Sequence, residues 1–435
     1  MLNSLLPSIL GVLLTMQAPV QPAAPATGQP APVAEQPAGP AAAEPAPQLP
    51  AGNPLDSSPA PRPAFVLKPS VALNDVGIDT NILGSSANPQ EDTVGHLSLG
   101  AEPSLTAGPV SLSGAGVVGL SYFRQHTDQR SVDTNDTFRL DYRLNRVTLY
   151  GADAFVRTRD IFSPELDMRL PRLENTADAG LTLQVTGNTQ IGAGVRHARF
   201  DFAADVLSTV DLHNSLTRAE DSLIVSLRDA ITPLTTIVVT SDVERDRFDF
   251  STFRNANGVR ILGGMEFKPT AFIFGKAFVG YRTRTSIDGS YPDAGTVVAS
   301  LDLGYNPWES VRLGVKVDRD LDHSFFSTER YYIVTGLSGS VTLRLGDAWE
   351  VGGTAGRQTL DYGASSLLDP VSGQPVLDAT PWSEHLLHFA GTVGYRLGRS
   401  AVLRFSPDYI RRDSQQAVRT YDRLRLVSSI TVGID

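Results

Sequence analysis

The residues best suited to acid–base or metal chemistry in this chain are its seven histidines, which are scattered along it. They are His96, His126, His197, His213, His323, His385 and His388. Only His385 and His388 are close in sequence, and positions three apart on a strand fall on opposite faces, so this pair cannot chelate one metal ion without a bend. The chain has no cysteine, which removes thiolate ligands and a cysteine nucleophile. We therefore expect no catalytic residue, no metal site and no cofactor.

An acidic run, Asp318-Arg319-Asp320-Leu321-Asp322, has the spaced carboxylates of a calcium-binding loop. It lacks the glycine at the sharp turn and the distant glutamate ligand of such loops. We interpret it as a solvated strand end. The net charge of −10 argues against a nucleic-acid partner, because such partners require a basic face.

Charged residues that would line a pore are the strongest functional candidates, because charged rings select ions in a narrow bore. Near one mouth the predicted inward set is Lys68, Arg143, Arg312, Lys316, Arg344, Arg396 and Arg404, set against Glu102, Glu266 and Glu350. Toward the other mouth the inward or loop positions are acidic, namely Asp242, Glu244, Asp318, Asp320, Asp361 and Asp408. The first mouth would be net basic, which predicts a mild anion preference. The alternative interpretation is a wall that is merely hydrated.

The elements that would position these side chains are strands. Residues 311–317 alternate apolar and polar side chains with a period of two, as do 297–305 and 424–434. Tight turns rich in Gly, Pro and Asn recur along the chain at Ala107-Gly108-Pro109, Asn145-Arg146, Gly187-Asn188, Thr232-Pro233, Lys268-Pro269, Asn306-Pro307, Gly346-Asp347 and Gly398-Arg399. Longer polar loops at 83–93, 160–172, 201–213 and 361–383 connect the other strand ends. This rhythm predicts an all-β, antiparallel, up-and-down transmembrane β-barrel of about 18 strands, with 16 possible.

The polar faces and the aromatic residues favour a membrane setting. The polar face carries Gly, Ser and Thr, which suit a wide wet lumen better than the outside of a soluble sandwich. Aromatic residues flank the tight turns (Phe267, Phe272, Tyr305, Trp308, Trp349, Tyr395) and the opposite strand ends (Tyr122, Tyr281, Tyr409, Tyr421), as in two interfacial girdles. No apolar run of about 18 residues exists, which excludes a helical membrane protein. We predict a Gram-negative outer-membrane location with both termini periplasmic. If a long loop folds into the lumen, 361–383 is our candidate.

The first 63 residues differ from the rest. Residues 1–17 hold a short apolar run followed by small residues, as in a signal peptide, although no Lys or Arg precedes the run. Residues 18–63 are rich in Pro and Ala and cannot bury a core, so we expect a disordered periplasmic tether. Residues 64–435 are assigned to the barrel.

One short motif resembles a known family. The segment Gly77-Ile78-Asp79-Thr80-Asn81-Ile82 is similar to the Gly-Tyr-Asp-x-Asn-Val-like segment near the start of the putative β-barrel porin 2 group. The resemblance extends loosely over residues 64–435. It implies an outer-membrane pore and a saccharide passenger, because members are often associated with exopolysaccharide production and export. Gly77, Asp79 and Asn81 are the matching positions; Asp79 and Asn81 would bind a cation or saccharide, or would close the loop as Asx residues do.

These observations predict a passive pore or a channel associated with exopolysaccharide export, and not an enzyme. The expected partners are outer-membrane lipid, polysaccharide or small solutes, and periplasmic export components. Two alternatives remain open. One is a barrel enzyme with a site at the outer rim, and the other is a structural or adhesive barrel with a closed lumen.

Overall fold

The computed structural model describes residues 64–433, apart from 167, 205, 208–209, 270, 288–292, 327–329, 364–365, 369–374, 378–380 and 399–400. The signal-like segment 1–17 and the tether 18–63 lie outside these residues. None of the helices in the described part of the chain is long and apolar enough to cross a membrane.

Eighteen long strands form one antiparallel sheet. They are β1 (Ala64–Asp79), β2 (Asp92–Ala107), β3 (Val110–Phe123), β4 (Ser131–Leu144), β5 (Val147–Thr158), β6 (Arg172–Gln184), β7 (Thr189–Phe202), β10 (Arg218–Thr232), β11 (Thr235–Phe248), β12 (Ala256–Phe267), β13 (Ile273–Ser286), β14 (Ala294–Trp308), β15 (Val311–His323), β16 (Tyr331–Leu345), β17 (Trp349–Tyr362), β20 (Trp382–Leu397), β21 (Ala401–Ser414) and β22 (Tyr421–Gly433).

Short elements lie in the connections between the long strands. They are the strands β8 (Val206–Leu207), β9 (Val210–Asp211), β18 (Ser366–Leu368) and β19 (Pro375–Leu377), the helix α2 (Leu212–Leu216) and the 3₁₀ turns η1 (Thr127–Gln129), η2 (Thr252–Arg254) and η3 (Ala417–Arg419).

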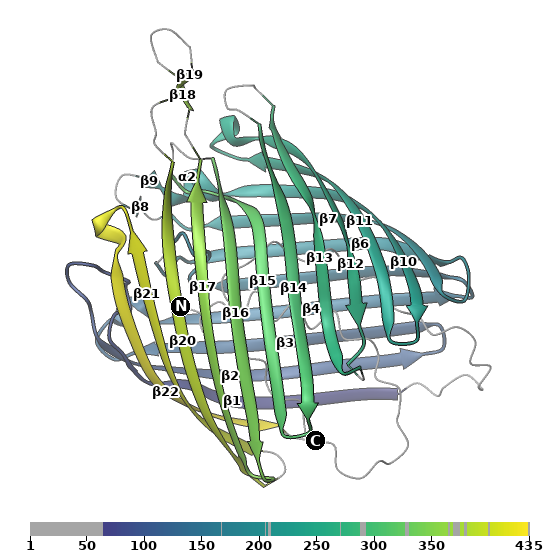
Figure 1. Ribbon diagram of the computed structural model, residues 1–435, viewed down its shortest axis with the longest axis horizontal. Coiled ribbons are helices and arrows are strands. Elements are labelled where there is room, and N and C mark those ends of the chain that lie inside the picture. The colour runs from purple at the N-terminus through teal and green to yellow at the C-terminus, as the bar shows by residue number, and fades with distance from the viewer. Residues whose placement is uncertain are drawn as a thin grey trace.

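The sheet closes into a barrel because β22 pairs with β1 (Figure 1). Every other long strand pairs with its neighbour in sequence, which is the up-and-down order. The prediction of about 18 strands is therefore confirmed. Apart from the loop ends of β14 and β15, closure leaves no free sheet edge, so the strand backbone groups can be satisfied within the barrel wall.

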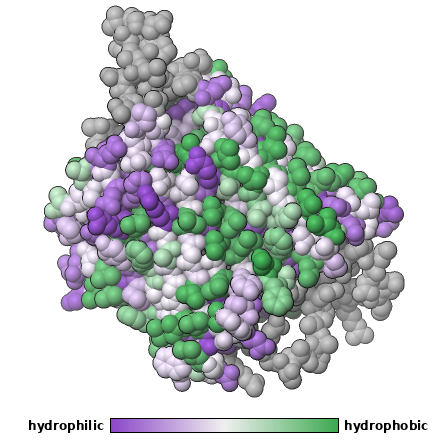
Figure 2. All heavy atoms as spheres, in the orientation of Figure 1, coloured by the Kyte–Doolittle hydropathy of each residue, from purple (hydrophilic) through white to green (hydrophobic). Residues whose placement is uncertain are grey.

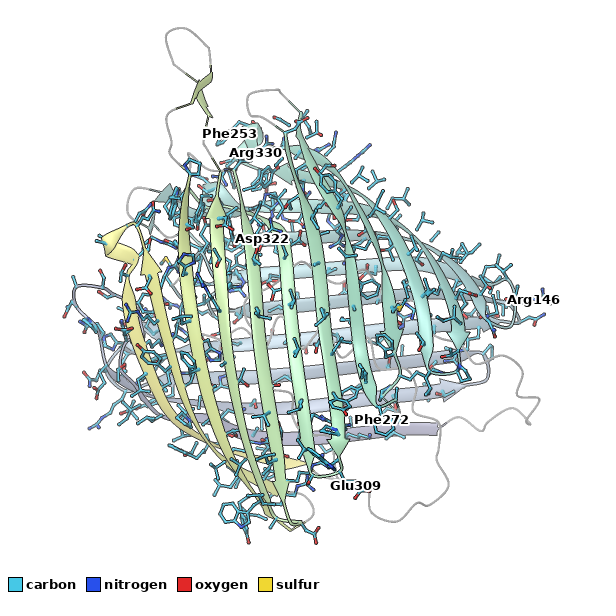
Figure 3. The ribbon with its side chains drawn as sticks, viewed as in Figure 1. Arg146, Phe253, Phe272, Glu309, Asp322 and Arg330 are labelled. Carbon is cyan, nitrogen blue, oxygen red and sulfur yellow. The ribbon has the colours of Figure 1, made fainter. Side chains whose placement is uncertain are left out.

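The predicted tight turns join strands at one end of the barrel, which we call the tight-turn end. Gly108, Gly346 and Gly398 have φ of 58°, 65° and 72°, the left-handed region that a turn requires and glycine tolerates. In Figure 3, Arg146, Phe272 and Glu309 lie at this end, and Phe253 and Arg330 lie at the opposite, loop end.

One predicted turn is wrong. Asn306 and Pro307 lie within β14, and the chain reverses two residues later, at Glu309-Ser310. The β14–β15 ladder is irregular between Tyr305 and Trp308, so the backbone around Pro307 is released from regular pairing. A proline is tolerated there because it lacks the N–H that a regular ladder would use.

Most outward side chains along the strands are apolar, as a lipid contact requires, and exposed charged pairs such as His197–Asp221 lie toward the loop ends. Figure 2 shows hydrophobic side chains spread over the visible wall. At the tight-turn end Phe272, Trp308 and Trp349 are exposed, and Tyr122 and Tyr281 are exposed toward the loop end. Tyr421 departs from the predicted girdle because it is 4% exposed and packs with Ile161 and Ile410.

At its loop end, β15 separates from β14. The β14–β15 pairs stop at Ala299 and Arg319, whereas β15 continues to His323 and stays paired with β16 up to Tyr331. The end of β15 thus leans inward over the lumen instead of continuing the wall. This departure positions part of the candidate site described next.

Candidate functional site

The lumen is the candidate site, and the alternation of the strands decides what lines it. On β16, Leu343 and Leu345 are exposed on the outer face, which places Arg344 between them on the inner face. On β21, Leu403 and Phe405 are exposed, which places Arg404 on the inner face. All seven predicted basic residues, Lys68, Arg143, Arg312, Lys316, Arg344, Arg396 and Arg404, belong to the inward set of their strands. Their role in ion selection stays a prediction.

Acidic side chains face several of these basic residues across the strands. Lys68 is the register partner of Glu102, and Arg344 is the register partner of Glu350. Lys316 lies 3.3 Å from Asp302 as an ion pair. The acidic side chains therefore cancel part of the positive charge at the tight-turn end. The electrostatic field there is weaker than seven unopposed cations would give.

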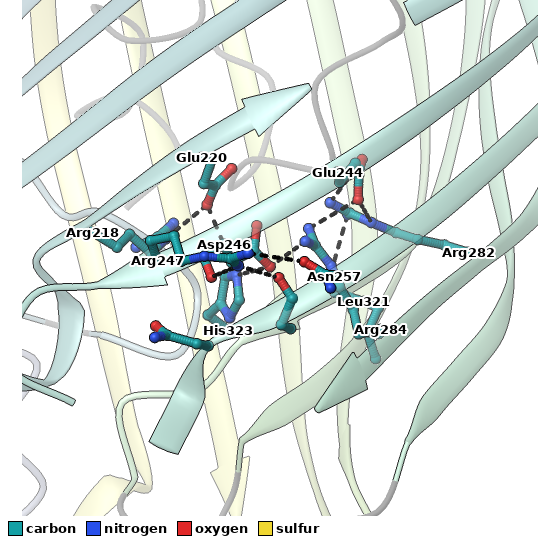
Figure 4. A network of polar contacts seen from close by, with 12 residues as sticks. Arg218, Glu220, Glu244, Asp246, Arg247, Asn257, Arg282, Arg284, Leu321 and His323 are labelled. Atoms are coloured by element: carbon teal, nitrogen blue, oxygen red, sulfur yellow. Dashed lines mark hydrogen bonds and ion pairs between the residues drawn. The ribbon is translucent and has the colours of Figure 1, made fainter. Parts of the chain in front are cut away.

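The loop half of the lumen holds a network of ion pairs on β11, β12, β13 and β15, and Figure 4 shows its part around Glu244, Asp246, Arg282 and Arg284. Arg260 lies 2.6 Å from Asp242, and Arg282 lies 3.1 Å from Glu244 and 3.0 Å from Asp320. Arg284 contacts Glu244 at 3.1 Å and also pairs with Asp246.

The acidity of the predicted vestibule is largely offset in this region, because arginines that we did not consider pair with the acids. Arg260, Arg282 and Arg284 occupy inward positions by the same alternation that placed Asp242 and Glu244 inward. The interpretation of the acidic run as a solvated strand end is wrong. Asp320 is 3% exposed because the end of β15 leans into the lumen.

The connection between β5 and β6 crosses the lumen. We call residues 159–171 the crossing segment. Surface loops are normally exposed, yet Ile161, Glu165, Leu166 and Leu170 are at most 2% exposed. Their contacts reach the β15–β16 connection and the region of β21 and η3. Six strands of the barrel separate β6 from β15, and four separate β22 from β5, so the segment bridges opposite parts of the wall.

Glu165 fastens the crossing segment on the far side. Its carboxylate accepts hydrogen bonds from Ser324 Oγ at 2.6 Å and from the Phe325 backbone N–H at 2.8 Å. Burial raises the pKa of the Glu165 carboxyl above its ordinary range. We call these contacts the latch.

Two arginines hold the backbone of the same segment. Arg412 donates to the Pro164 carbonyl at 2.8 Å, and Arg419 donates to the Glu165 carbonyl. Glu384 pairs with both arginines, which fixes their direction. A buried charge needs such partners because the interior does not solvate it.

Apolar side chains also hold the crossing segment in place. Leu166 and Leu170 pack with Phe202, with Leu212 and Leu216 of α2, and with Phe325. Ile161 packs with Ile410 and Tyr421. The segment that folds inward is therefore 159–171. Much of our candidate, 361–383, lies outside the described residues, and its strands β18 and β19 pair with each other.

The family-like motif Gly77, Asp79 and Asn81 closes the barrel seam. Asp79 is 1% exposed and pairs with Arg423 of β22, with Nε at 2.9 Å. Asn81 donates to the carbonyls of Ser85 and Asp422, and its side-chain oxygen accepts from the Ser85 N–H. A Cβ at Gly77 would meet the Leu426 carbonyl oxygen, so no other residue fits against β22 there. These contacts favour the loop-closing interpretation of Asp79 and Asn81 over ligand binding.

The two neighbouring histidines lie on opposite faces, as expected. His388 is inward and lies 2.6 Å from Asp408. His385 is on the outer face beside Thr359, with 3.2 Å between Nδ1 and Oγ1. Sequence reasoning did not anticipate one group of possible metal ligands, Glu220, Asp246 and His323, because its members come from three strands.

Comparison with solved structures gives only distant similarities. The chain is 11% identical to *Pseudomonas aeruginosa* OpdQ over 85% of this chain and 98% of that one, with a TM-score of 0.45. It is 11% identical to *P. aeruginosa* OpdK with vanillate (85% and 99%, TM-score 0.43) and 10% identical to the *P. aeruginosa* siderophore receptor PirA (86% and 82%, TM-score 0.41).

Comparison with protein families is decisive. No curated protein sequence matches the chain significantly. The family described as putative beta-barrel porin 2 matches residues 63–433, which is the whole barrel. The chain therefore belongs to the putative β-barrel porin 2 family and is a β-barrel of the outer membrane of a Gram-negative bacterium.

Proposed function

We propose that the protein is a gated outer-membrane pore for hydrophilic solutes, with the crossing segment as its gate. The observation that carries this proposal is the latch, in which Glu165 on one side of the lumen binds Ser324 and Phe325 on the other. Passage through the barrel requires this segment to move or to leave a path beside it.

The chemistry of the latch suits a reversible closure. A permanent plug gains most from apolar packing, whereas burying a carboxylate carries a desolvation cost that offsets most of what its partners contribute. Glu165, Arg412 and Arg419 supply polar contacts that water can replace once the segment moves. These polar contacts therefore add little net free energy to closure, as a two-state element requires.

We propose saccharides as the passengers, in association with exopolysaccharide export. Two features support this proposal. The inward face carries small hydroxyl-bearing and glycine positions such as Ser338, Thr342 and Thr392, which hydrate a polar passenger without binding it tightly. The family to which the chain belongs is often associated with exopolysaccharide export. Passage would need no covalent chemistry, and the expected lack of turnover on esters and peptides can be assayed directly.

A structural or adhesive barrel with a closed lumen is the second candidate. The near-complete burial of Ile161, Leu166 and Leu170 favours it, because these residues seal the crossing segment with apolar contacts. The two candidates differ in whether the segment ever opens.

Recordings in planar lipid bilayers, combined with liposome swelling, test the proposal. The purified full-length protein should give discrete openings, and neutral oligosaccharides should enter liposomes that contain it. Openings without saccharide entry would support the proposed pore but contradict the proposal that saccharides pass through it. A barrel that folds, as shown by a gel mobility that changes on boiling, but never conducts would support the closed structural barrel.

A further inference from the structure

Three side chains with the chemistry of metal ligands converge inside the loop half of the lumen. Glu220 comes from β10, Asp246 from β11 and His323 from the end of β15 (Figure 4). One ligand atom from each residue lies within 4.8 Å of the others. The convergence depends on the departure of β15 from β14, which carries His323 inward.

The distances nearly match a small divalent ion. His323 Nε2 lies 3.3 Å from Asp246 Oδ2 and 3.8 Å from Glu220 Oε1. Zinc holds nitrogen and oxygen ligands at about 2.0–2.2 Å, so a tetrahedral site places them roughly 3.4 Å apart. Because the ligand atoms of the group are separated by up to 4.8 Å, the Glu220 side chain would have to move inward to complete three ligands, and water can fill the remaining positions.

The second observation is that His323 lacks the hydrogen bonds a buried imidazole normally makes. Its side chain is 9% exposed, and among the described residues Nδ1 has no hydrogen-bond partner, while Nε2 faces the Asp246 and Glu220 carboxylates at 3.3 and 3.8 Å. Asp246 Oδ1 also lacks one there. Buried polar atoms are nearly always satisfied, so orphaned atoms on two adjoining side chains indicate a missing partner.

The arginines beside the cluster do not exclude a cation. Arg218 lies 2.7 Å from Glu220 Oε1, and Arg284 pairs with Asp246 Oδ2, which are the oxygens that face His323. An ion would share these oxygens with the arginines or take the second oxygen of each carboxylate, of which Asp246 Oδ1 has no partner among the described residues. Ligating carboxylates are commonly hydrogen-bonded by outer residues, which orient them. In the surrounding network four arginines face five carboxylates: Arg218, Arg260, Arg282 and Arg284 against Glu220, Asp242, Glu244, Asp246 and Asp320. The local charge therefore leaves room for added positive charge.

We propose that Glu220, Asp246 and His323 bind a divalent first-row transition ion of the zinc type. One imidazole and two carboxylates suit such an ion better than calcium, which prefers oxygen ligands alone. The bound ion would tie the end of β15 to β10 and β11. Ser324 and Phe325, which form the latch, directly follow His323. If the crossing segment is the gate, the ion would steady its latch, but ion binding itself does not rest on the proposed function.

Cobalt(II) is the probe, because protein-bound Co²⁺ absorbs visible light and its spectrum reports the ligands. The folded full-length barrel in detergent should show a saturable visible band, displaced by Zn²⁺. The variant H323Q should bind Co²⁺ roughly tenfold or more weakly, as ligand loss costs at least as much as loss of an outer partner. The matched control is H388Q, which removes another buried lumen histidine whose recorded partner is the single carboxylate of Asp408. H388Q should keep the wild-type spectrum and affinity.

A second variant covers a folding failure of H323Q. E220Q changes a side chain that is 25% exposed and leaves its volume unchanged, and it should also weaken Co²⁺ binding roughly tenfold or more. The site is refuted if the wild type shows no saturable band. It is equally refuted if the folded H323Q or E220Q binds Co²⁺ as tightly as the wild type. Because binding is read by absorption, these results are independent of whether the barrel conducts.

Discussion

Glu165 and Ser324 are hydrogen-bonded at 2.6 Å although they lie 159 residues apart and belong to connections on different sides of the barrel. This contact fastens the crossing segment across the lumen of the 18-stranded barrel. At this strand number side chains alone do not fill the interior, so under the proposed function the crossing segment decides whether solutes pass.

Replacing Glu165 with alanine should favour the open state. The substitution removes the acceptor of the Ser324 hydroxyl and the Phe325 N–H and leaves both donors buried. The cost to the closed state is about 1–3 kcal/mol, which corresponds to a shift of roughly 5- to 150-fold toward opening. Single-channel recordings measure this as a rise in open probability. An open probability equal to that of the wild type would show that Glu165 does not hold the segment.

The latch should tighten as the pH falls. Burial raises the pKa of Glu165 above its ordinary value of 4.5, with Ser324, Phe325, Arg419 and Tyr362 as the groups that oppose this shift. The closed state therefore binds the proton more tightly than the open state. The closed state is therefore most stable at a pH below the ordinary pKa of a glutamate side chain. It loses this stability as the pH rises through the raised pKa of Glu165. Open probability should rise over that interval in the wild type. The variant E165Q, which is neutral at every pH, should lose this dependence, and an unchanged pH profile in E165Q would assign the dependence to other groups.

Replacing Asp79 with alanine should destabilise the seam between the first and last strands. Arg423 would remain buried without its main partner, which costs about 3–5 kcal/mol. The temperature at which the folded band disappears on a gel should fall clearly. The control is D413A, which removes an exposed ion pair with Arg411 near the end of β21 and should change that temperature little. Equal shifts in the two variants would contradict a special role for the seam.

Reversing two basic residues at the tight-turn end should change ion selectivity. Arg344 and Arg396 both face the lumen on strands of the same direction. The wild type should show a mild anion preference, which R344E/R396E should lose or reverse. The reversal potential in a salt gradient measures the preference. Identical potentials would mean that the bore at this end is wider than the reach of wall charges, about 8–10 Å in ordinary salt.

The barrel could be predicted from the sequence because strands and turns are specified by residues that are close together in the chain. Alternation with a period of two shows which side chains of a strand point inward, and Gly or Asn marks where the chain reverses. Both signals can be read from a few neighbouring residues. The same phase placed Arg344 and Arg396 on the inner face. The error at Pro307 arose because a proline after Asn was taken as a turn, whereas an irregular β14–β15 ladder accommodates it within the strand.

The contents of the lumen could not be predicted in the same way, because they depend on contacts between distant segments. Nothing near Glu165 in sequence specifies Ser324 or Arg419 as its partner. One local signal did exist. Ile161, Leu166 and Leu170 are unusually apolar for an exposed loop, and large apolar residues in a loop indicate burial. Likewise, His323 lies near Glu220 and Asp246 only because the end of β15 separates from β14. The alternation of side chains along β15 does not predict this separation.

The most direct test of gating replaces residues 161–170 with a short Gly-Asn turn and compares bilayer conductance with that of the wild type. Thr158 and Arg172 are already register partners, so a tight connection can join β5 to β6 without disturbing the wall. A gel mobility that changes on boiling confirms folding of both proteins. We predict that the shortened barrel stays open and conducts more per channel than the wild type. Equal conductance and equal open probability in the two folded proteins would contradict the claim that the crossing segment controls the lumen.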